Sequence, residues 1–169
     1  EVHLVEKEKE LGGHLRSIHY LLGEDYDPKV KLEAMIKAVM ENDKIHLYLN
    51  ADVVDVYGFV GNFKSRIRQH NGENKEIEHG IVIVATGAVE YKPIEYLYGK
   101  DSRVITQHEL EEKIADGAFK AKNVVMIQCV GARNEERPNC ARICCGQAIK
   151  NALKIKEASP ETEVYILYK

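Results

Sequence analysis

All four cysteines of this 169-residue chain lie within seventeen residues, between Cys129 and Cys145. Their spacing is Cys-x10-Cys-x3-Cys-Cys, so the last two are adjacent. Zinc sites usually combine ligand pairs two to four residues apart, whereas an iron–sulfur cluster tolerates adjacent thiolates because its ligands bind different irons. The spacing therefore favours a 4Fe-4S cluster, for which four thiolates are the right number. Zinc and free thiols remain alternatives, with a dithiol enzyme built on the adjacent pair the weakest of them.

Composition narrows the class of protein. The chain is 44% hydrophobic and 30% charged, which suits a globular protein with a real core. A net charge of −3 gives no reason to expect nucleic-acid binding. No apolar run is long enough to span a membrane and no leader-like segment opens the chain, so we expect a cytoplasmic protein. Thiols stay reduced in that compartment, so clustered cysteines indicate metal binding or catalysis before disulfides.

The order of predicted elements indicates an α/β, Rossmann-like fold fragment with a mostly parallel sheet. Alternating residues on either side of Gly61-Asn62 predict a β-meander. The continuous apolar run "GIVIVATGA" predicts a strand that is buried on both faces. The C-terminal part predicts a strand at Asn123 to Cys129, a helix at Cys140 to Glu157 and a closing strand, which together form a βαβ unit.

This order predicts three parts. Residues 1–91 form a partial FAD-binding domain, residues 92–122 form a connecting segment with a short helix, and residues 123–169 form the cysteine-rich start of a second nucleotide-binding-like domain.

Three stretches carry signals for a bound dinucleotide. Glu6 ends a short apolar strand, where dinucleotide-binding folds place the acidic residue that accepts hydrogen bonds from a ribose. Gly12 and Gly13 follow where a backbone can approach a phosphate, because glycine has no Cβ. The small residues of "VATGA" would let a cofactor lie against the main chain. Together these stretches favour a flavin-type dinucleotide fold.

The stretches resemble the pyridine nucleotide-disulfide oxidoreductase group of flavoproteins, in which a strand ends in Glu-Lys and is followed by a Gly-Gly loop, a β-meander and an "ATG" strand. The resemblance implies that Val53 touches the adenine through its backbone, and that Thr86 and Gly87 close over the cofactor. The full set of FAD-binding residues that it implies is Glu6, Lys7, Gly12, Gly13, His14, Val53, Thr86 and Gly87.

The glycine-rich loop that opens the pattern of that group is not found before Glu6. The G-x-G-x-x-G loop and its strand should lie about twenty residues earlier, so we expect an internal fragment with weakened FAD affinity. The strand at Asn123 to Cys129 or a second copy of the chain would then have to fill the gap in the sheet, which makes a homodimer an option.

The stretch "NVVMIQCVGARNEERPNCARICCGQAIKNALKIKE" stands where such flavoproteins have a nicotinamide domain with a phosphate loop. The sequence of this stretch resembles that of the A-type subunit of heterodisulfide reductase, a family of FAD and iron–sulfur oxidoreductases of anaerobes. The resemblance implies electron transfer between flavin and cluster within a heterodisulfide reductase-like or quinone-linked complex. It also implies four metal ligands, Cys129, Cys140, Cys144 and Cys145.

The same resemblance implies a catalytic Lys150 beside the flavin ring, against the alternative of a solvated lysine. Arg133 and Arg142 are candidates to donate hydrogen bonds to cluster sulfurs, or to pair with nearby glutamates. We expect the isolated fragment to be inactive. The alternative function is a zinc-stabilised structural or docking module without redox activity.

Overall fold

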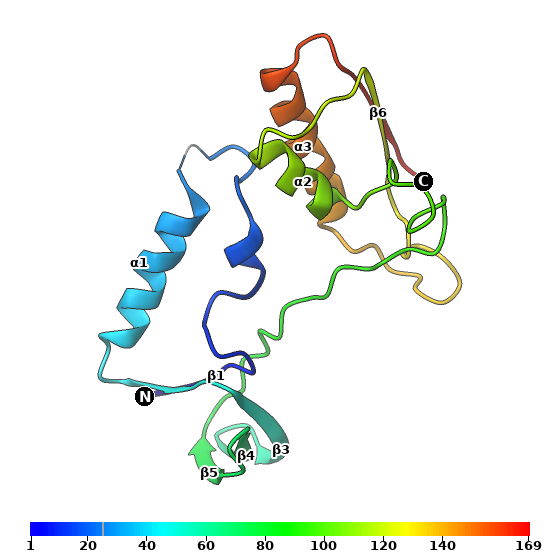
Figure 1. Cartoon of the computed structure of the whole chain (residues 1–169). Helices are drawn as coiled ribbons and strands as arrows, with labels where there is room; N and C mark the ends of the chain where they lie inside the picture. Colours follow the sequence, from blue (N-terminus) through cyan, green and yellow to red (C-terminus); the bar gives the residue numbers. More distant parts are fainter. Residues whose placement is uncertain (25) are drawn as a thin grey trace. The chain divides into compact units, whose positions relative to one another are not determined.

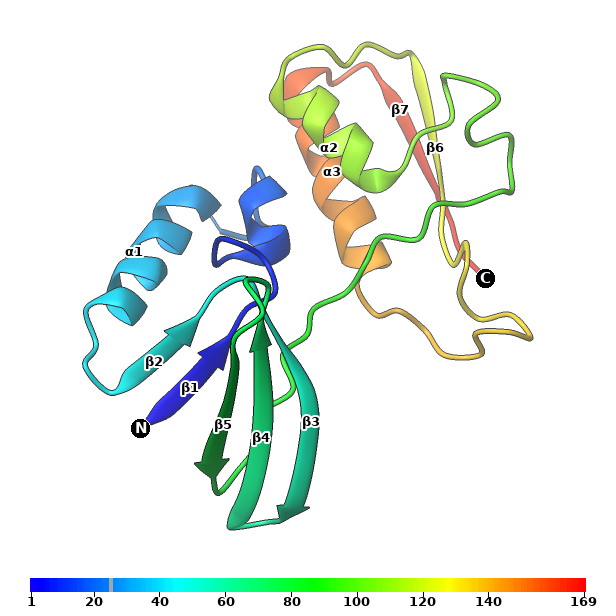
Figure 2. The same cartoon turned by 60° about the horizontal axis from the view of Figure 1, so that its bottom comes forward.

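The structure is a computed structural model that describes residues 1–24 and 26–169. The chain folds into two compact units. The first unit comprises Glu1–Ser17 and Pro28–Ala88, and the second comprises Ile18–Asp27 and Val89–Lys169. Figures 1 and 2 show the elements of each unit.

The first unit combines a small parallel pair of strands with an antiparallel sheet. Strands β1 (Val2–Val5) and β2 (Ile45–Tyr48) pair in parallel, with Val2 opposite Ile45. The 3-10 helix η1 (Gly13–Ser17) and the helix α1 (Pro28–Met40) lie between them in sequence. Strands β3 (Ala51–Phe59), β4 (Asn62–Gln69) and β5 (Asn74–His79) form the meander in that order (Figure 2).

The core of the first unit forms where the meander meets β2. Ile67 is fully buried and packs with Tyr48, Ala51 and Ile77, and Val5 of β1 lies against them. The meander and its turn at Gly61-Asn62 confirm the sequence prediction.

The second unit contains the predicted βαβ arrangement. Strands β6 (Asn123–Ile127) and β7 (Glu163–Leu167) pair in parallel, and α3 (Cys144–Ala158) connects them. A further helix, α2 (Gln107–Ala115), lies beside α3 (Figure 2). The core that these elements share consists of Leu110, Met126, Ala148 and Ile155. The α/β class with parallel pairs and an antiparallel meander is thereby confirmed.

Two predicted elements differ from the structure. The run "GIVIVATGA" (80–88) is not a strand, and Ile83 is 86% exposed and Val84 79% exposed. A strand needs a neighbour that accepts its backbone hydrogen bonds, and no described strand pairs with this run. The expectation that Asn123 to Cys129 fills the gap in the sheet of the first unit is also wrong, because β6 and β7 form a two-stranded sheet of their own.

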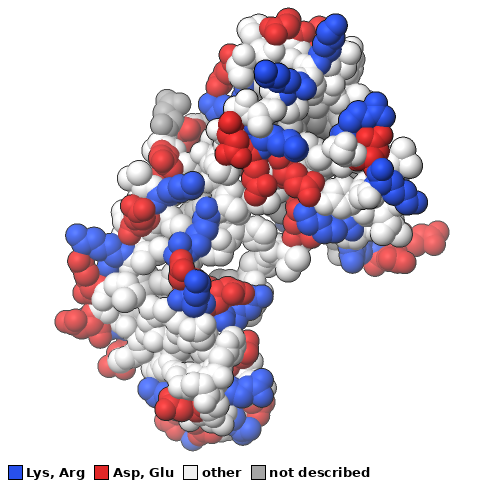
Figure 3. Space-filling view, viewed as in Figure 1, with Lys and Arg blue, Asp and Glu red and all other residues white. Residues whose placement is uncertain are grey.

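The surface carries charges of both signs. In the face shown in Figure 3, lysine and arginine side chains are interspersed with aspartate and glutamate over each unit. Within the described part of the chain, none of the helices has the length and apolar character to cross a membrane.

Candidate functional site

The cysteine loop occupies the connection from β6 to α3. Cys129 follows the end of β6 by two residues, Cys140 lies in the irregular segment, and Cys144 and Cys145 are the first two residues of α3. The predicted helix start at Cys140 is therefore wrong by four residues. All four thiols are free; Cys129 and Cys144 are half-buried, and Cys140 and Cys145 are exposed.

The loop between the first two cysteines has an irregular but internally bonded backbone. Cys129, Arg133 and Arg142 all have left-handed backbone conformations, with φ of 63°, 55° and 64°. Such conformations are unfavourable for non-glycine residues. The Arg133 N–H donates to the Asn139 carbonyl at 3.4 Å, and the Asn134 N–H donates to the Arg137 carbonyl at 3.2 Å. These hydrogen bonds fold the loop back on itself between Cys129 and Cys140.

N–H groups from this segment point at two of the sulfur atoms. The backbone N–H of Arg142 donates to Cys140 Sγ at 3.3 Å, and Nη1 of Arg133 lies 3.9 Å from Cys129 Sγ. Arg133 therefore approaches a cysteine sulfur through its side chain, and Arg142 through its backbone. At the start of α3, Ile143 forms no side-chain cap, so no capping side chain accepts from the first-turn N–H groups beside Cys144. The free N–H groups of such a helix end favour negative charge nearby.

The other three thiols lie close enough to Cys145 to affect its ionisation. The pKa of the Cys145 thiol is raised, first by desolvation, then by the charge and hydrogen bond of Cys144, and then by the charges of Cys129 and Cys140. No three metal-binding side chains of the described residues converge on one point. The chemistry of the donor set nevertheless fits a soft metal centre, because four thiols and two N–H donors to sulfur are present in one short loop.

Lys150, the predicted catalytic residue, is buried in the second unit. Its Nζ lies 2.8 Å from Glu111 Oε2, and the two side chains are 7% and 0% exposed. Glu111 also accepts hydrogen bonds from the backbone N–H of His19, at 2.8 Å, and from the side chain of Gln147. The Lys150 ammonium lies 4.9 Å from the centre of the Tyr20 ring. The alternative of a solvated lysine is therefore wrong.

The carboxylate of Glu111 stays ionised in this setting. Burial alone would raise the pKa of Glu111, but hydrogen bonds from Lys150, His19 and Gln147 outweigh it and hold the pKa below its usual value. Glu111 was not among the functional residues predicted from the sequence. The pattern that could have pointed to it is an acidic residue directly after Leu110, an inward position of α2.

The predicted FAD-binding residues all lie in the first unit. The structure brings the glycine loop and the "VATGA" segment together, because His14 Nε2 contacts the carbonyl of Ala88. Gly12 has φ of 120°, and a Cβ there would lie 2.9 Å from Leu32 Cδ2, so this position requires glycine. Glu6 is half-buried at the end of β1, where its carboxylate accepts from the Glu8 N–H at 3.0 Å.

The remaining residues of that predicted set are accessible. Val53 is 49% exposed on β3, and Lys7, Thr86 and Gly87 are also exposed. A ligand could therefore reach each of these positions without displacing the core.

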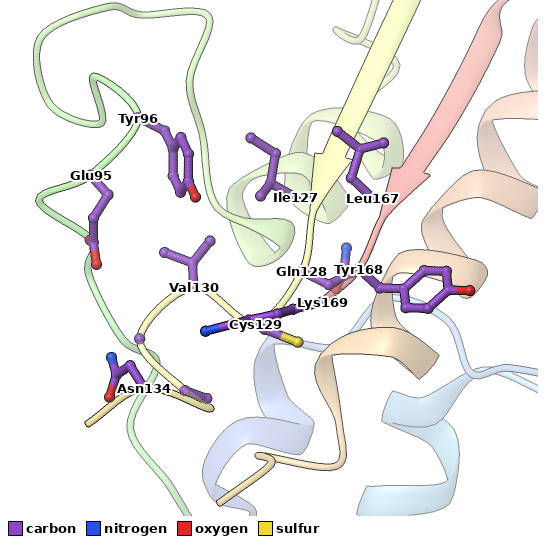
Figure 4. A pocket seen from close by; sticks show the side chains of 12 residues that line it. Glu95, Tyr96, Ile127, Gln128, Cys129, Val130, Asn134, Leu167, Tyr168 and Lys169 are labelled. Carbon is purple, nitrogen blue, oxygen red and sulfur yellow. The ribbon is translucent and has the colours of Figure 1, made fainter. Parts of the chain in front are cut away.

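A pocket that the sequence did not predict opens at the carboxyl ends of β6 and β7. It encloses about 400 Å³. In Figure 4, Tyr96 and Val130 face Ile127 and Leu167, which mark the ends of the two strands, across the pocket. Gln128 lines it and is 6% exposed, and its Nε2 has no hydrogen-bond partner among the described residues. Cys129 also lines the pocket.

The fold and the cysteine loop together define a Rossmann-like α/β protein with a candidate thiolate metal centre. The structure is similar to that of L-proline dehydrogenase from P. horikoshii, with a TM-score of 0.51 and 15% sequence identity. That similarity covers 99% of this chain and 30% of the other, and it concerns the fold alone.

Sequence comparison finds relatives over part of the chain. No protein-family profile matches the chain. The A-type subunit of the H(2):CoB-CoM heterodisulfide,ferredoxin reductase of Methanothermobacter thermautotrophicus is 43% identical over 113 residues, which is 57% of this chain and 17% of that protein. The A-type iron-sulfur subunit of the CoB--CoM heterodisulfide reductase of Methanocaldococcus jannaschii is 40% identical over 114 residues, again 57% and 17%.

Over the matched part, the chain is similar to A-type heterodisulfide reductase subunits, which confirms the resemblance seen in the sequence. It spans less than a fifth of the length of these curated relatives.

Proposed function

We propose that this chain is part of an oxidoreductase subunit of the heterodisulfide reductase type, which passes electrons between FAD and a 4Fe-4S cluster. The observation that supports it most is the four-thiol loop between β6 and α3, because four thiolates are the ligand number of a cubane cluster. The names of the relatives, which describe reductase subunits and in one case an iron-sulfur subunit, point the same way.

In the second unit, the chain's own residues would hold the cluster and adjust its charge. The four cysteines would be the ligands, and the N–H donors of Arg133 and Arg142 would stabilise negative charge on sulfur. When bound, the cluster would accept and release single electrons. The uncapped start of α3 would stabilise the negative charge of a cluster held by Cys144 and Cys145.

In the first unit, exposed and glycine positions would bind FAD. Glu6, with Lys7 beside it, would accept hydrogen bonds from the ribose, and Gly12, Gly13 and His14 would border the pyrophosphate. Val53 would touch the adenine, and Thr86 and Gly87 would cover the cofactor. The contact of His14 with Ala88 supports this set, because it brings two of these segments together.

Lys150 would be the catalytic side chain, since a cation beside a flavin stabilises its reduced, anionic form. The ion pair with Glu111 would then set how much of that positive charge acts on the flavin. We place the protein in the cytoplasm, with the other subunits of a heterodisulfide reductase-like or quinone-linked complex as partners and a second copy of the chain as an option.

The test is anaerobic purification followed by analysis of iron, sulfide, zinc and FAD. We expect roughly four iron and four sulfide per chain, with broad absorption in the visible range. Cys144→Ser should lower the iron content, whereas Lys100→Ala, an exposed change in the same unit, should leave it unaltered. One zinc and no sulfide per chain would instead identify a zinc-stabilised module. A parent protein that contains neither iron nor FAD would refute the proposal.

A further inference from the structure

Tyr91 packs directly on the cysteine loop. A Cβ built on Gly131 would lie 2.3 Å from Cδ1 and 2.5 Å from Cε1 of the Tyr91 ring, so the ring rests on the glycine backbone. The guanidinium carbon of Arg137 lies 4.9 Å from the centre of the same ring. Gly131 is two residues after Cys129, and Arg137 is three residues before Cys140. One aromatic ring therefore contacts both arms of the loop between the first two cysteines.

The backbone of the loop is strained, so contacts from outside the loop help to hold it. Cys129 and Arg133 hold left-handed backbone conformations, which persist only where the surrounding structure imposes them. Within the loop, the backbone N–H groups of Arg133 and Asn134 donate across the two arms at 3.4 and 3.2 Å. Asn134 Oδ1 accepts from the Arg137 N–H at 2.7 Å, and Lys169 Nζ donates to the Arg133 carbonyl at 3.0 Å. The Tyr91 ring adds packing and a cation–π contact at the same place.

The Tyr91 side chain comes from a separate part of the second unit, the irregular segment that precedes α2. Its hydroxyl lies 3.4 Å from Glu95 Oε2 on the same segment. The ring, and not the hydroxyl, makes the contacts with the loop. A phenylalanine would therefore preserve the packing on Gly131 and the contact with Arg137.

We propose that Tyr91 is a positioning residue that clamps the two arms of the 129–140 loop and so fixes the sulfurs of Cys129 and Cys140 for metal binding. This inference rests on the proposed function for its metal-binding part. The clamp itself is a property of the protein without metal.

The experiment compares wild type, Tyr91→Ala and Tyr91→Phe, with Tyr165→Ala as a matched control. Tyr165 is a half-exposed tyrosine on β7 in the same unit. The first measurement is hydrogen exchange of peptides covering residues 129–140 in the metal-free protein. We expect about fivefold faster exchange in Tyr91→Ala, as loss of one aromatic clamp implies, and wild-type exchange in Tyr91→Phe and Tyr165→Ala.

The second measurement is the rate at which an iron chelator bleaches the visible absorption of the anaerobically reconstituted protein. We expect cluster loss to be about fivefold faster in Tyr91→Ala, in line with the faster loop opening, and unchanged in Tyr91→Phe. A general loss of folding would also accelerate exchange in β6 and β7, which we expect to stay protected.

The two readouts separate the two claims. Unchanged exchange of the loop in Tyr91→Ala would overturn the clamp. Faster exchange with an unchanged rate of cluster loss would overturn the positioning role. If the wild type takes up no cluster at all, the proposed function fails, while hydrogen exchange still decides whether Tyr91 clamps the loop.

Discussion

The carboxylate of Glu111 is fully buried and accepts hydrogen bonds from Lys150, His19 and Gln147. A buried ion pair does not by itself imply high stability, because burial costs both charges their hydration. Removing one partner, however, leaves the other charge buried and unpaired. Removing one partner is therefore expected to lower the free energy of unfolding by more than the intact pair contributes to it.

We expect Lys150→Met to lower the free energy of unfolding of the second unit by about 3–5 kcal/mol. The matched control is Lys154→Met, one turn further along α3, whose partner Glu157 is 63% exposed. We expect that change to cost less than about 1 kcal/mol. Urea unfolding monitored by circular dichroism measures both. Equal effects of the two substitutions would show that Glu111 is not buried as described.

The ionisation of Glu111 should make the second unit sensitive to acid. Its pKa is lowered in the folded state, so its contribution to stability is fully present above the pKa of the unfolded chain, about 4.3. That contribution is lost as the pH falls through the lowered folded value. We expect the urea concentration at the unfolding midpoint of the wild type to decrease when the pH is lowered below about 4.5. In Glu111→Gln, the share of this decrease that comes from protonation of Glu111 should be absent. An identical pH profile for the variant would contradict the assignment.

At the scale of the elements, the start of helix α2 is fixed by side chains of its own first turn. The Thr106 hydroxyl accepts from the Glu109 N–H at 3.2 Å, and the Glu109 carboxylate accepts from the Thr106 N–H at 2.7 Å. This reciprocal pair is a capping box. It fixes the start of the helix that carries Glu111.

We expect Thr106→Ala to destabilise the second unit by about 1 kcal/mol, since it leaves a helix N–H without its side-chain acceptor. Ser102→Ala, an exposed serine in the preceding loop, is the control and should have little effect. Thermal unfolding of the two variants provides the comparison. No difference between them would mean that the capping box does not hold in solution.

At the scale of the whole molecule, each unit has its own apolar core. Ile67 is 0% exposed in the first core and Ile155 is 1% exposed in the second. We expect Ile67→Ala and Ile155→Ala each to cost about 2–5 kcal/mol, each in its own unit. Hydrogen exchange should report faster opening of β4 in the first variant and of β6 in the second. Faster exchange in both units from a single substitution would show that they unfold as one.

Much of the fold follows from local patterns in the sequence. Turn residues at Gly61-Asn62 and alternating side chains define the meander, and Asp27-Pro28 followed by apolar residues at helical spacing defines α1. The spacing of the cysteines likewise identified the candidate metal loop. These signals depend on residues close in sequence, so no tertiary information is needed to find them.

The errors arose where a partner distant in sequence decides the outcome. The run at 80–88 has every local feature of a buried strand, yet it remains irregular because no described strand lies beside it. For Lys150 the sequence left a solvated side chain as an alternative, and only the contact with Glu111, 39 residues away, excludes it.

The sequence by itself determined the class of fold and the four-thiol loop, since periodicity and spacing are properties of the chain, and its motifs carried the resemblance to heterodisulfide reductase subunits. Only the tertiary structure decided that Glu111 pairs with Lys150, that Tyr91 rests on Gly131, and that His14 contacts Ala88. The physical reason is that such contacts join residues far apart in sequence, and the free energy of each depends on burial and distance, which no local pattern specifies.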